Sequence, residues 1–274
     1  MKLVRTKAEL RAALDDLTGR RALVMTMGAL HAGHLALVEA ARANADHVVV
    51  SIYVNPLQFG PNEDFAAYPR DLEADLALLD GRADVVFAPS DAEMYPDQPL
   101  VRLDPGPVAT VLEGATRPGH FAGVLQVVNK VMNLVHPDVA VFGQKDAQQL
   151  ALVRTMVRDL DLGIEILPVP IVRDPDGLAR SSRNSYLTAQ QRAQALALSH
   201  ALAAGSRAAA GGPAATLSAA ESVLADAVGV RKDYLVLVDP LTFQPVAEGA
   251  RAGLLAVAAW VGSTRLIDNL EVTF

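Results

Sequence analysis

Two histidines and two glycines follow the first apolar run of the chain, in the sequence TMGALHAGH at residues 26–34. Gly28 and Gly33 let the backbone turn tightly and approach a ligand. Apolar residues at helical spacing follow, so this segment begins a helix. The N-terminus of that helix presents unpaired N–H groups and positive potential. His31 and His34 lie on one side of a first helical turn, where both imidazoles can donate hydrogen bonds to phosphate. The alternatives are a structural pair or a zinc pair, and the latter lacks an HExxH pattern and any cysteine partner.

A second group of polar side chains stands where another apolar run ends, in the sequence FGQKDAQQ at residues 142–149. Lys145 can act as a point cation for phosphate. Asp146 can accept hydrogen bonds from a ribose or help to hold a metal ion, and Gln149 can bind a hydroxyl or a carboxylate. Taken alone, a Lys-Asp pair at a helix start is usually an N-cap beside a solvated lysine. Two strand-end motifs of complementary chemistry favour the functional interpretation.

A third candidate is the sequence SSRN at residues 181–184, which follows the turn-forming residues 174–177. Two hydroxyls and one guanidinium in succession suit phosphate binding. The alternative is a serine-rich turn with an exposed arginine. The position just after the strand-rich part of the chain favours a phosphate-binding loop.

Candidate substrate groups lie in two further sequences, VNPLQF and RPGHFAGV. Asn55 and Gln58 are neutral amides at the end of an expected strand, and such groups suit a substrate rich in hydroxyls. The alternative is a plain Asn-Pro turn with an exposed glutamine. Arg117 can attract a carboxylate or a phosphate, whereas His120 is better explained as a structural residue at the start of a buried helix.

Short apolar runs alternate with helical patterns in the first 170 residues or so, which indicates a parallel sheet covered on both faces. The strand-like runs are residues 21–26, 47–54, 84–87, 139–142 and 164–169. The helix-like segments are residues 34–44, 71–79, 121–135 and 147–160. An α/β fold of this kind binds ligands beyond the carboxyl ends of its strands, where the first two motifs stand.

The pattern changes after about residue 172. Residues 189–228 are alanine-rich and helical, with a break at 211–213. Strand-like runs then follow at residues 234–238, 254–261 and 265–273. Helices followed by strands predict a second, smaller α+β domain, so we expect domains at residues 1–172 and 173–274.

Composition limits the classes of function. The chain of 274 residues is 51% hydrophobic and 20% charged, which is ordinary for a globular protein. A net charge of −7 argues against general nucleic-acid binding. Without cysteine there is no disulfide, thiolate nucleophile or cysteine-bound metal. No apolar run has the length of a signal peptide core or a membrane helix, so we expect a cytoplasmic enzyme or binding protein.

The strand–Gly–HxGH–helix sequence is typical of the HxGH nucleotidyltransferase superfamily, whose members attack the α-phosphate of ATP with a carboxylate or phosphate. The ordered set TMGALHAGH, VNPLQF, AYPRD, RPGHFAGV, FGQKDAQQ, SSRNSYL and TRLIDN resembles the pantothenate synthetase family from about residue 21 to residue 270. This resemblance implies a Rossmann-like, doubly wound N-terminal domain that binds ATP and pantoate, and a C-terminal domain that closes over the active site. It also implies a homodimer, a requirement for Mg²⁺, and ligation of pantoate to β-alanine through a pantoyl adenylate.

The resemblance also assigns roles to individual residues. His34 corresponds to the catalytic acid, and His31 and Lys145 bind the phosphates. The implied ATP-binding residues are Met27, Gly28, Ala29, Leu30, His31, Ala32, Gly33, His34, Gly143, Gln144, Lys145, Asp146, Val172, Arg180, Ser181, Ser182 and Arg183. The implied substrate-binding residues are Gln58 and Gln149, which hold pantoate, with Gln58 also close to the β-alanine site and Asn55, Tyr68 and Arg117 as further pocket residues. The metal ligands stay open between Asp75, Asp146 and the phosphates themselves.

Four positions depart from the family pattern. Met25 stands where proline is common, and Ala147 replaces an aromatic residue. Gln144 replaces a glutamate beside the expected phosphate-binding lysine, and Arg180 replaces a methionine and adds a cation near the nucleotide. These changes affect details of ATP affinity.

Two rival interpretations of the whole chain are another HxGH nucleotidyltransferase, which would leave AMP attached to its product, and a nucleotide-binding module without catalysis.

Overall fold

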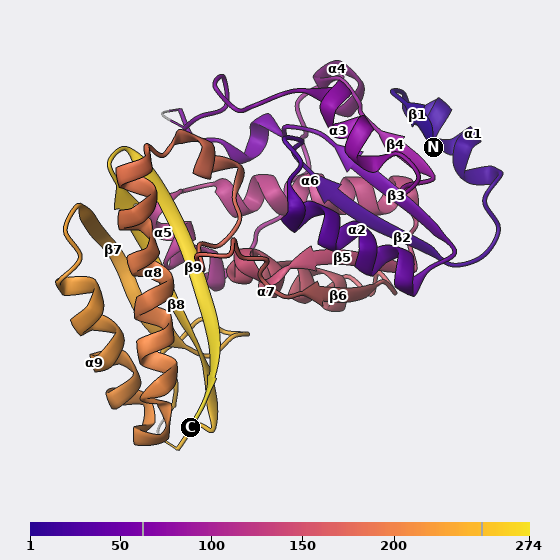
Figure 1. Ribbon diagram of the computed structural model, residues 1–274. Helices are drawn as coiled ribbons and strands as arrows, with labels where there is room; N and C mark the ends of the chain where they lie inside the picture. Colours follow the sequence, from indigo (N-terminus) through magenta and orange to yellow (C-terminus); the bar gives the residue numbers. More distant parts are fainter. Residues whose placement is uncertain (62, 248) are drawn as a thin grey trace. The chain divides into compact units, whose positions relative to one another are not determined.

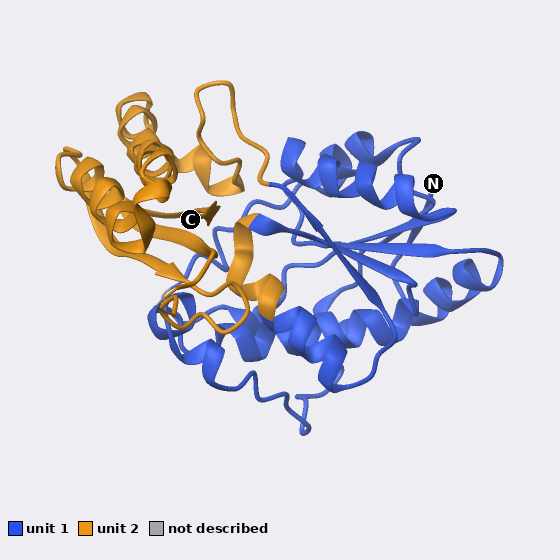
Figure 2. Ribbon diagram, turned by 90° about the horizontal axis from the view of Figure 1, so that it is seen from below, with its two compact units in different colours: residues 1–144, 152–170 blue, residues 145–151, 171–274 orange. Residues whose placement is uncertain are grey.

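The computed structural model describes residues 1–61, 63–247 and 249–274. The chain forms two compact units, drawn in different colours in Figure 2. The first unit comprises residues 1–144 and 152–170, and the second comprises residues 145–151 and 171–274. Within the described ranges, no helix is both long and apolar enough to cross a membrane.

The first unit contains a six-stranded sheet with helices on both faces (Figures 1 and 2). The strand order is β1-β4-β3-β2-β5-β6, and every neighbouring pair is parallel. The strands are β1 (Lys2–Val4), β2 (Arg21–Thr26), β3 (His47–Ile52), β4 (Val85–Phe87), β5 (Val139–Gly143) and β6 (Glu165–Val169). The helices that connect them are α1 (Lys7–Asp15), α2 (Ala32–Asn44), α3 (Leu72–Leu79), α4 (Asp91–Met94), α5 (Glu113–Thr116), α6 (His120–Val135) and α7 (Ala147–Asp159). Short 3-10 turns are η1 (Pro56–Gln58), η2 (Pro107–Thr110) and η3 (Gln144–Asp146).

The central strands are apolar along their whole length because both faces of the sheet are covered. Val48, Val49 and Val50 of β3 are 0% exposed, although successive side chains of a strand point to opposite faces. Val24 of β2 and Val139 of β5 are equally buried. The doubly wound, Rossmann-like sheet expected from the sequence is therefore confirmed.

The strand order changes direction at β2. From there the chain continues through β3 to β4 on one side, whereas β5 and β6 extend the sheet on the other side. Ligands of open α/β sheets bind beyond the carboxyl ends of the strands at such a switch point. The segment that leaves β2 carries the two histidines, so the fold places this motif where ligands usually bind.

The sequence patterns predict no element before residue 21, whereas the structure has β1 and α1 there. β1 is a three-residue edge strand paired only with β4, too short to show an alternating pattern. α1 begins with a capping box in which Thr6 accepts from the Glu9 N–H and the Glu9 side chain accepts from the Thr6 N–H. This start signal is present in the sequence and predicts the helix when it is applied.

The second unit contains an antiparallel sheet in the order β7-β8-β9 and two long helices. Its elements are η4 (Ser182–Tyr186), α8 (Ala189–Arg207), η5 (Ala209–Gly211), α9 (Gly212–Ala225), β7 (Val230–Val238), β8 (Ala252–Val261) and β9 (Thr264–Thr273). The helices α8 and α9 pack against each other, and α8 also lies against β8 and β9. Buried leucines at 198, 202 and 255 form part of the core between them. The expected smaller α+β part is confirmed.

Strand β7 begins four residues before the predicted start at residue 234. Its first part contains Arg231, Lys232 and Asp233, which are exposed, because β7 is the edge strand of its sheet. The pairing register with β8 also shifts between Lys232 and Tyr234. A polar, irregular edge resembles a loop in sequence, which explains the short prediction.

Candidate active site

The segment that joins β2 to α2, residues 27–34, is called the histidine loop here. Gly28 and Ala29 both have positive φ angles, 82° and 51°, so the chain reverses sharply after the strand. The Gly28 N–H donates to the Thr26 Oγ1 atom at 3.2 Å. A Cβ atom at position 28 would lie 2.9 Å from an Asp75 carboxylate oxygen. Both the backbone angle and the lack of space therefore require glycine at this position.

Asp75 on α3 holds the histidine loop in place. Its side chain is buried, and its two oxygens accept from the N–H groups of Ala29 at 3.1 Å and Leu30 at 2.7 Å. Burial raises the pKa of Asp75 above its ordinary value, and these two hydrogen bonds offset only part of that rise. Sequence reasoning missed this anchoring role, since it considered Asp75 only as a candidate metal ligand.

His31 and His34 form a capping box at the start of α2. His31 is the N-cap residue, and its Nδ1 atom accepts from the Gly33 N–H at 3.1 Å. The Nδ1 atom of His34 accepts from the His31 N–H at 3.3 Å. The two ring centroids lie 4.1 Å apart, so the spacing correctly predicts that the rings are neighbours.

The capping box fixes the tautomer of both rings. A neutral imidazole nitrogen that accepts a hydrogen bond carries no proton, so the proton lies on Nε2 in each ring. His31 and His34 thus present two N–H donors beside the positive end of the helix dipole. Such donors match the oxygens of a phosphate group.

The two predicted substrate amides follow β3, and one of them, Gln58, contacts the histidine loop. Asn55 is 1% exposed, and its Nδ2 group donates to the Gln58 Oε1 atom at 3.1 Å and to the Gly123 carbonyl at 3.0 Å. The Gln58 Nε2 group lies 3.2 Å from the Met27 Sδ atom. Asn55 therefore orients Gln58, and Gln58 lies next to the histidine loop.

Arg117 and His120 lie together near Gln58. Arg117 pairs with Glu63 at 2.6 Å, and its Nη1 atom lies 3.0 Å from the His120 Nε2 atom. Burial raises the pKa of Glu63, but the hydrogen bonds and positive charge of Arg117 outweigh it, so the net pKa is lowered. The other His120 nitrogen lies 2.9 Å from the Gln58 carbonyl, in keeping with the structural role expected for this histidine. Tyr68 is buried and packs edge-on against Phe59.

The second predicted motif forms a turn after β5. Residues 144–146 are the 3-10 turn η3, which leads directly into α7. The carbonyl of Lys145 accepts from the Asn269 Nδ2 group of β9 at 2.9 Å. Asp146 is exposed, and Gln149 is half-buried on the first turn of α7. The backbone of Lys145 is thereby fixed to the antiparallel sheet of its own unit.

The third predicted motif leads into η4. The Ser181 hydroxyl accepts from the Arg183 N–H at 3.3 Å and caps this turn. The Arg180 N–H donates to the Val172 carbonyl at 2.9 Å. The Arg180 guanidinium forms an ion pair with Asp174. The extra cation expected at position 180 therefore has a carboxylate partner within this unit.

Comparisons with known proteins identify one family whose members resemble this chain over almost its whole length. The family model of pantoate-beta-alanine ligase matches residues 2–271. The chain is 57% identical to a pantothenate synthetase of Thermobifida fusca, over 99% of this chain and 95% of that protein. The crystal structure of pantothenate synthetase from Thermus thermophilus has a TM-score of 0.95 at 48% identity, covering 100% of both chains.

The chain belongs to the pantoate–β-alanine ligase family. A structure from Francisella tularensis, described as a pantoate-beta-alanine ligase complexed with beta-gamma ATP and beta-alanine, has a TM-score of 0.82 at 33% identity. It covers 98% of this chain and 97% of that one. The chain is therefore a ligase that joins pantoate to β-alanine and uses ATP.

The described carboxylates of this ligase limit how a magnesium ion would be held if one is required. No group of three or more histidine, aspartate or glutamate side chains in the described part of the chain is placed to bind a metal. Both oxygens of Asp75 already accept backbone N–H groups, whereas Asp146 is exposed at the start of α7. This arrangement of carboxylates fits a magnesium ion that would be held mainly by phosphate oxygens and water, because Mg²⁺ usually keeps several waters.

Gly123 of the ligase packs its backbone against the turn that carries Gln58. A Cβ atom at position 123 would lie 2.2 Å from the Leu57 carbonyl oxygen and 2.6 Å from the Gln58 nitrogen. We expect Gly123→Ala to lower the free energy of unfolding by about 1–3 kcal/mol, because the backbones must separate. Denaturant unfolding and pantoate titration measure the two effects, and pantoate affinity should fall as well.

Gly60→Ala is the matched control for that substitution. A Cβ atom there would meet only Glu63, at an ordinary distance of 3.7 Å. If Gly123→Ala were as stable as Gly60→Ala, the close approach between α6 and η1 would not be what positions Gln58.

Proposed function

We propose that this ligase forms a pantoyl adenylate, and that the histidine loop binds the triphosphate of ATP. The observation that supports this most directly is the capping box, in which both Nδ1 atoms accept backbone N–H groups at the N-terminus of α2, so that each Nε2 atom carries the proton. The loop lies at the switch point of the sheet, and Gln58 contacts it through Met27. A phosphate-binding element and a group that can bind hydroxyls therefore lie side by side.

The proposed reaction has two steps. The pantoate carboxylate attacks the α-phosphorus of ATP and pyrophosphate leaves. The amine of β-alanine then attacks the acyl carbon of the adenylate, and AMP leaves. Proximity of the bound substrates and preorganised donors account for the rate, and no covalent enzyme intermediate is required.

The proposed roles follow from the type of each side chain. His34 donates to the phosphate that becomes more negative in the transition state, and Lys145 and Arg183 add positive charge. Gln58 and Gln149 hold the hydroxyl and carboxylate groups of pantoate. A magnesium ion on the phosphates, with Asp146 as its protein ligand, would neutralise charge on the leaving pyrophosphate.

The resemblance of the motifs to the family also supports a magnesium requirement, a homodimer and a cytoplasmic location. Chelation with EDTA and size-exclusion chromatography test the first two.

One incubation separates this function from its rivals. The protein is mixed with ATP, Mg²⁺, pantoate and β-alanine, and the products are identified by mass spectrometry. The proposed route yields pantothenate, AMP and pyrophosphate in equal amounts. Another nucleotidyltransferase would yield a product that retains AMP, and a binding module would yield none.

Gln58 is expected to act on pantoate and not on ATP. Gln58→Ala should weaken pantoate binding by about 10- to 100-fold, because a buried hydroxyl or carboxylate of the ligand loses its partner. Calorimetric titration of pantoate and of ATP measures both affinities. Gln190→Ala, at an exposed position on α8, is the control. Equal weakening of both ligands would contradict the assignment.

A further inference from the structure

Two backbone groups of the first unit hold the Asn55 side chain in one orientation. The Asn55 Nδ2 group donates to the Gly123 carbonyl at 3.0 Å, and the Oδ1 atom accepts from the Leu57 N–H at 3.4 Å. A carbonyl can only accept a hydrogen bond and a backbone N–H can only donate one, so the two ends of the amide cannot be exchanged. Asn55 therefore offers a fixed donor on one side and a fixed acceptor on the other.

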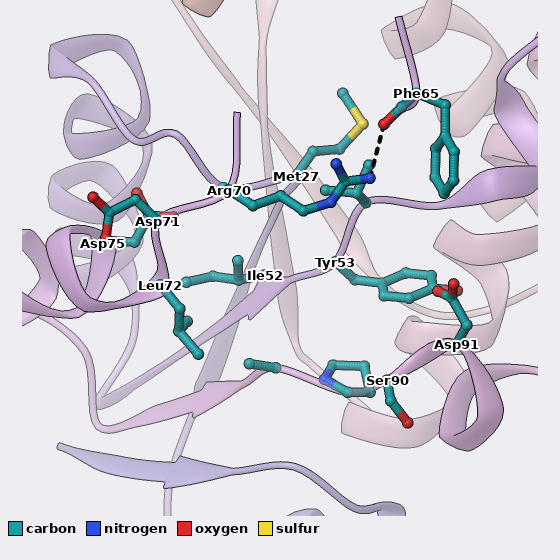
Figure 3. A pocket seen from close by; sticks show the side chains of 14 residues that line it. Met27, Ile52, Tyr53, Phe65, Arg70, Asp71, Leu72, Asp75, Ser90 and Asp91 are labelled. Carbon is teal, nitrogen blue, oxygen red and sulfur yellow. Dashed lines mark hydrogen bonds between the residues drawn. The ribbon is translucent and has the colours of Figure 1, made fainter. Parts of the chain in front are cut away.

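The fixed donor of Asn55 determines the orientation of Gln58. The Asn55 Nδ2 group also donates to the Gln58 Oε1 atom at 3.1 Å, which leaves the Nε2 group of Gln58 3.2 Å from the Met27 Sδ atom. Met27 itself lines a cavity of about 290 Å³ beyond the carboxyl ends of β3 and β4 (Figure 3). Gln58 therefore presents N–H donors to a ligand, and these match the carboxylate and hydroxyl oxygens of pantoate.

The fixed acceptor of Asn55 is bound by Tyr95, the residue that ends α4. The Tyr95 hydroxyl donates to the Asn55 Oδ1 atom at 3.3 Å. Burial raises the pKa of Tyr95 to about 12, so the hydroxyl keeps its proton and remains a donor at neutral pH. Two hydrogen bonds in series thus connect Tyr95, through Asn55, to the amide of Gln58.

The ring of Tyr95 is itself held by two neighbours. The ammonium nitrogen of Lys130, on α6, lies 4.8 Å from the Tyr95 ring centroid, within the range of a cation–π interaction. The rings of Tyr53 and Tyr95 lie 6.3 Å apart between centroids and are tilted by 55°. These contacts fix the plane of the Tyr95 ring and keep its hydroxyl within reach of Asn55.

We propose that Tyr95 is a positioning residue of the ligase, which acts through Asn55 to keep the N–H groups of Gln58 directed at pantoate. The proposal rests on the proposed role of Gln58 in pantoate binding. Tyr95 acts by limiting rotation of the two amides before pantoate binds, because a preorganised donor loses less freedom on binding. Without the hydroxyl, the Asn55 Oδ1 atom would keep the longer contact to the Leu57 N–H, and both amides would be less restricted.

Tyr95→Phe removes the hydroxyl and keeps the ring. The Kd for pantoate should rise by about 3- to 10-fold, as expected for one lost hydrogen bond between neutral groups, whereas the Kd for ATP should not change. Calorimetric titration measures both. Exchange of labelled pyrophosphate into ATP, which needs pantoate but not β-alanine, should show a higher KM for pantoate and an unchanged rate at saturation.

Tyr53→Phe is the matched control, because it makes the same change in the neighbouring ring. The Tyr53 ring points toward Asp91 in Figure 3, and in the described part of the chain no hydrogen bond joins its hydroxyl to Asn55. Pantoate affinity should therefore stay at the wild-type value in this variant.

Combination with Gln58→Ala separates positioning from general structural support. If Tyr95 acts through Gln58, Tyr95→Phe has no further effect once the Gln58 amide is absent, so the double variant should bind pantoate as Gln58→Ala does. Two variants of Lys130 keep the test valid if Tyr95→Phe is unstable. Lys130→Met should weaken pantoate binding slightly, and Lys130→Arg, which keeps a cation over the ring, should bind pantoate as the wild type does.

Unchanged pantoate affinity in Tyr95→Phe would overturn the proposal. Additive losses in the double variant, or equal weakening of ATP and pantoate, would also overturn it, because Tyr95 would then support the whole unit and not Gln58 in particular. Unchanged pantoate affinity in Gln58→Ala alone would instead refute the role of Gln58 itself.

Discussion

Replacement of His34 by alanine is expected to slow adenylate formation by on the order of 10²–10³-fold, as when one preorganised transition-state donor is lost. The Nδ1 atom of His34 accepts from the His31 backbone, which fixes the proton on Nε2. That Nε2–H group stands at the N-terminus of α2, where negative charge on a phosphate is already favoured. Pyrophosphate exchange with saturating ATP and pantoate measures this step without β-alanine.

The same side chain also caps α2, so stability must be separated from chemistry. His34→Gln keeps an acceptor at the third helical position, where glutamine can reach back to the N-cap N–H. We expect His34→Gln to unfold near the wild-type temperature and still lose most of its exchange rate. His200→Ala, at an exposed position on α8, is the control for loss of a histidine. A His34→Gln protein with full exchange activity would refute the role of this imidazole as a donor.

The sequence predicts the parts of the site that depend on local pattern. β3 and β5 are recognisable because buried parallel strands are continuously apolar, and their ends place Gln58 and Lys145 after strands. The start of α2 is equally recognisable from its glycines and its two histidines three residues apart. These features depend on neighbours in the chain, so one sequence is enough to reveal them.

The contacts that hold the site together depend on residues far apart in the chain. Asp75 follows the histidine loop by more than forty residues, and an acidic residue in the first turn of a helix is usually read as a partner of that helix's dipole. Glu63 pairs with Arg117 across a separation of 54 residues. Neither partner can be identified without the packing of the sheet and its helices.

Arg180, which stands where the family usually has a methionine, is another residue whose partner the sequence does not reveal. From the sequence, Arg180 adds a cation near the nucleotide, but in the structure it pairs with Asp174, which also binds Arg192 at 2.7 Å. The charge of Arg180 is thus balanced within its own unit. The positive charge that Arg180 adds is therefore offset by the carboxylate of Asp174, six residues earlier in the chain.

Lys145→Ala is expected to reduce adenylate formation by on the order of 10²–10³-fold, because a fixed positive charge stabilises the phosphates as negative charge moves to the leaving group. The Asn269 amide holds the Lys145 carbonyl at 2.9 Å, so the backbone position of residue 145 does not depend on its side chain. The variant should therefore fold normally, and the loss should appear in kcat more than in the KM for ATP.

Two further variants, Lys145→Arg and Asn269→Leu, separate the contribution of the lysine's charge to the rate from the contribution of its position. Arg keeps the charge on a longer, planar group, so it should recover part of the rate. Asn269→Leu keeps the lysine but removes the contact to its backbone, so it should cause a smaller loss. Lys2→Ala, at an exposed position on the edge strand, controls for the loss of one positive charge. Because the proposed mechanism has no covalent intermediate, it depends on fixed charges of this kind. An unchanged exchange rate in Lys145→Ala would mean that another cation stabilises the leaving pyrophosphate.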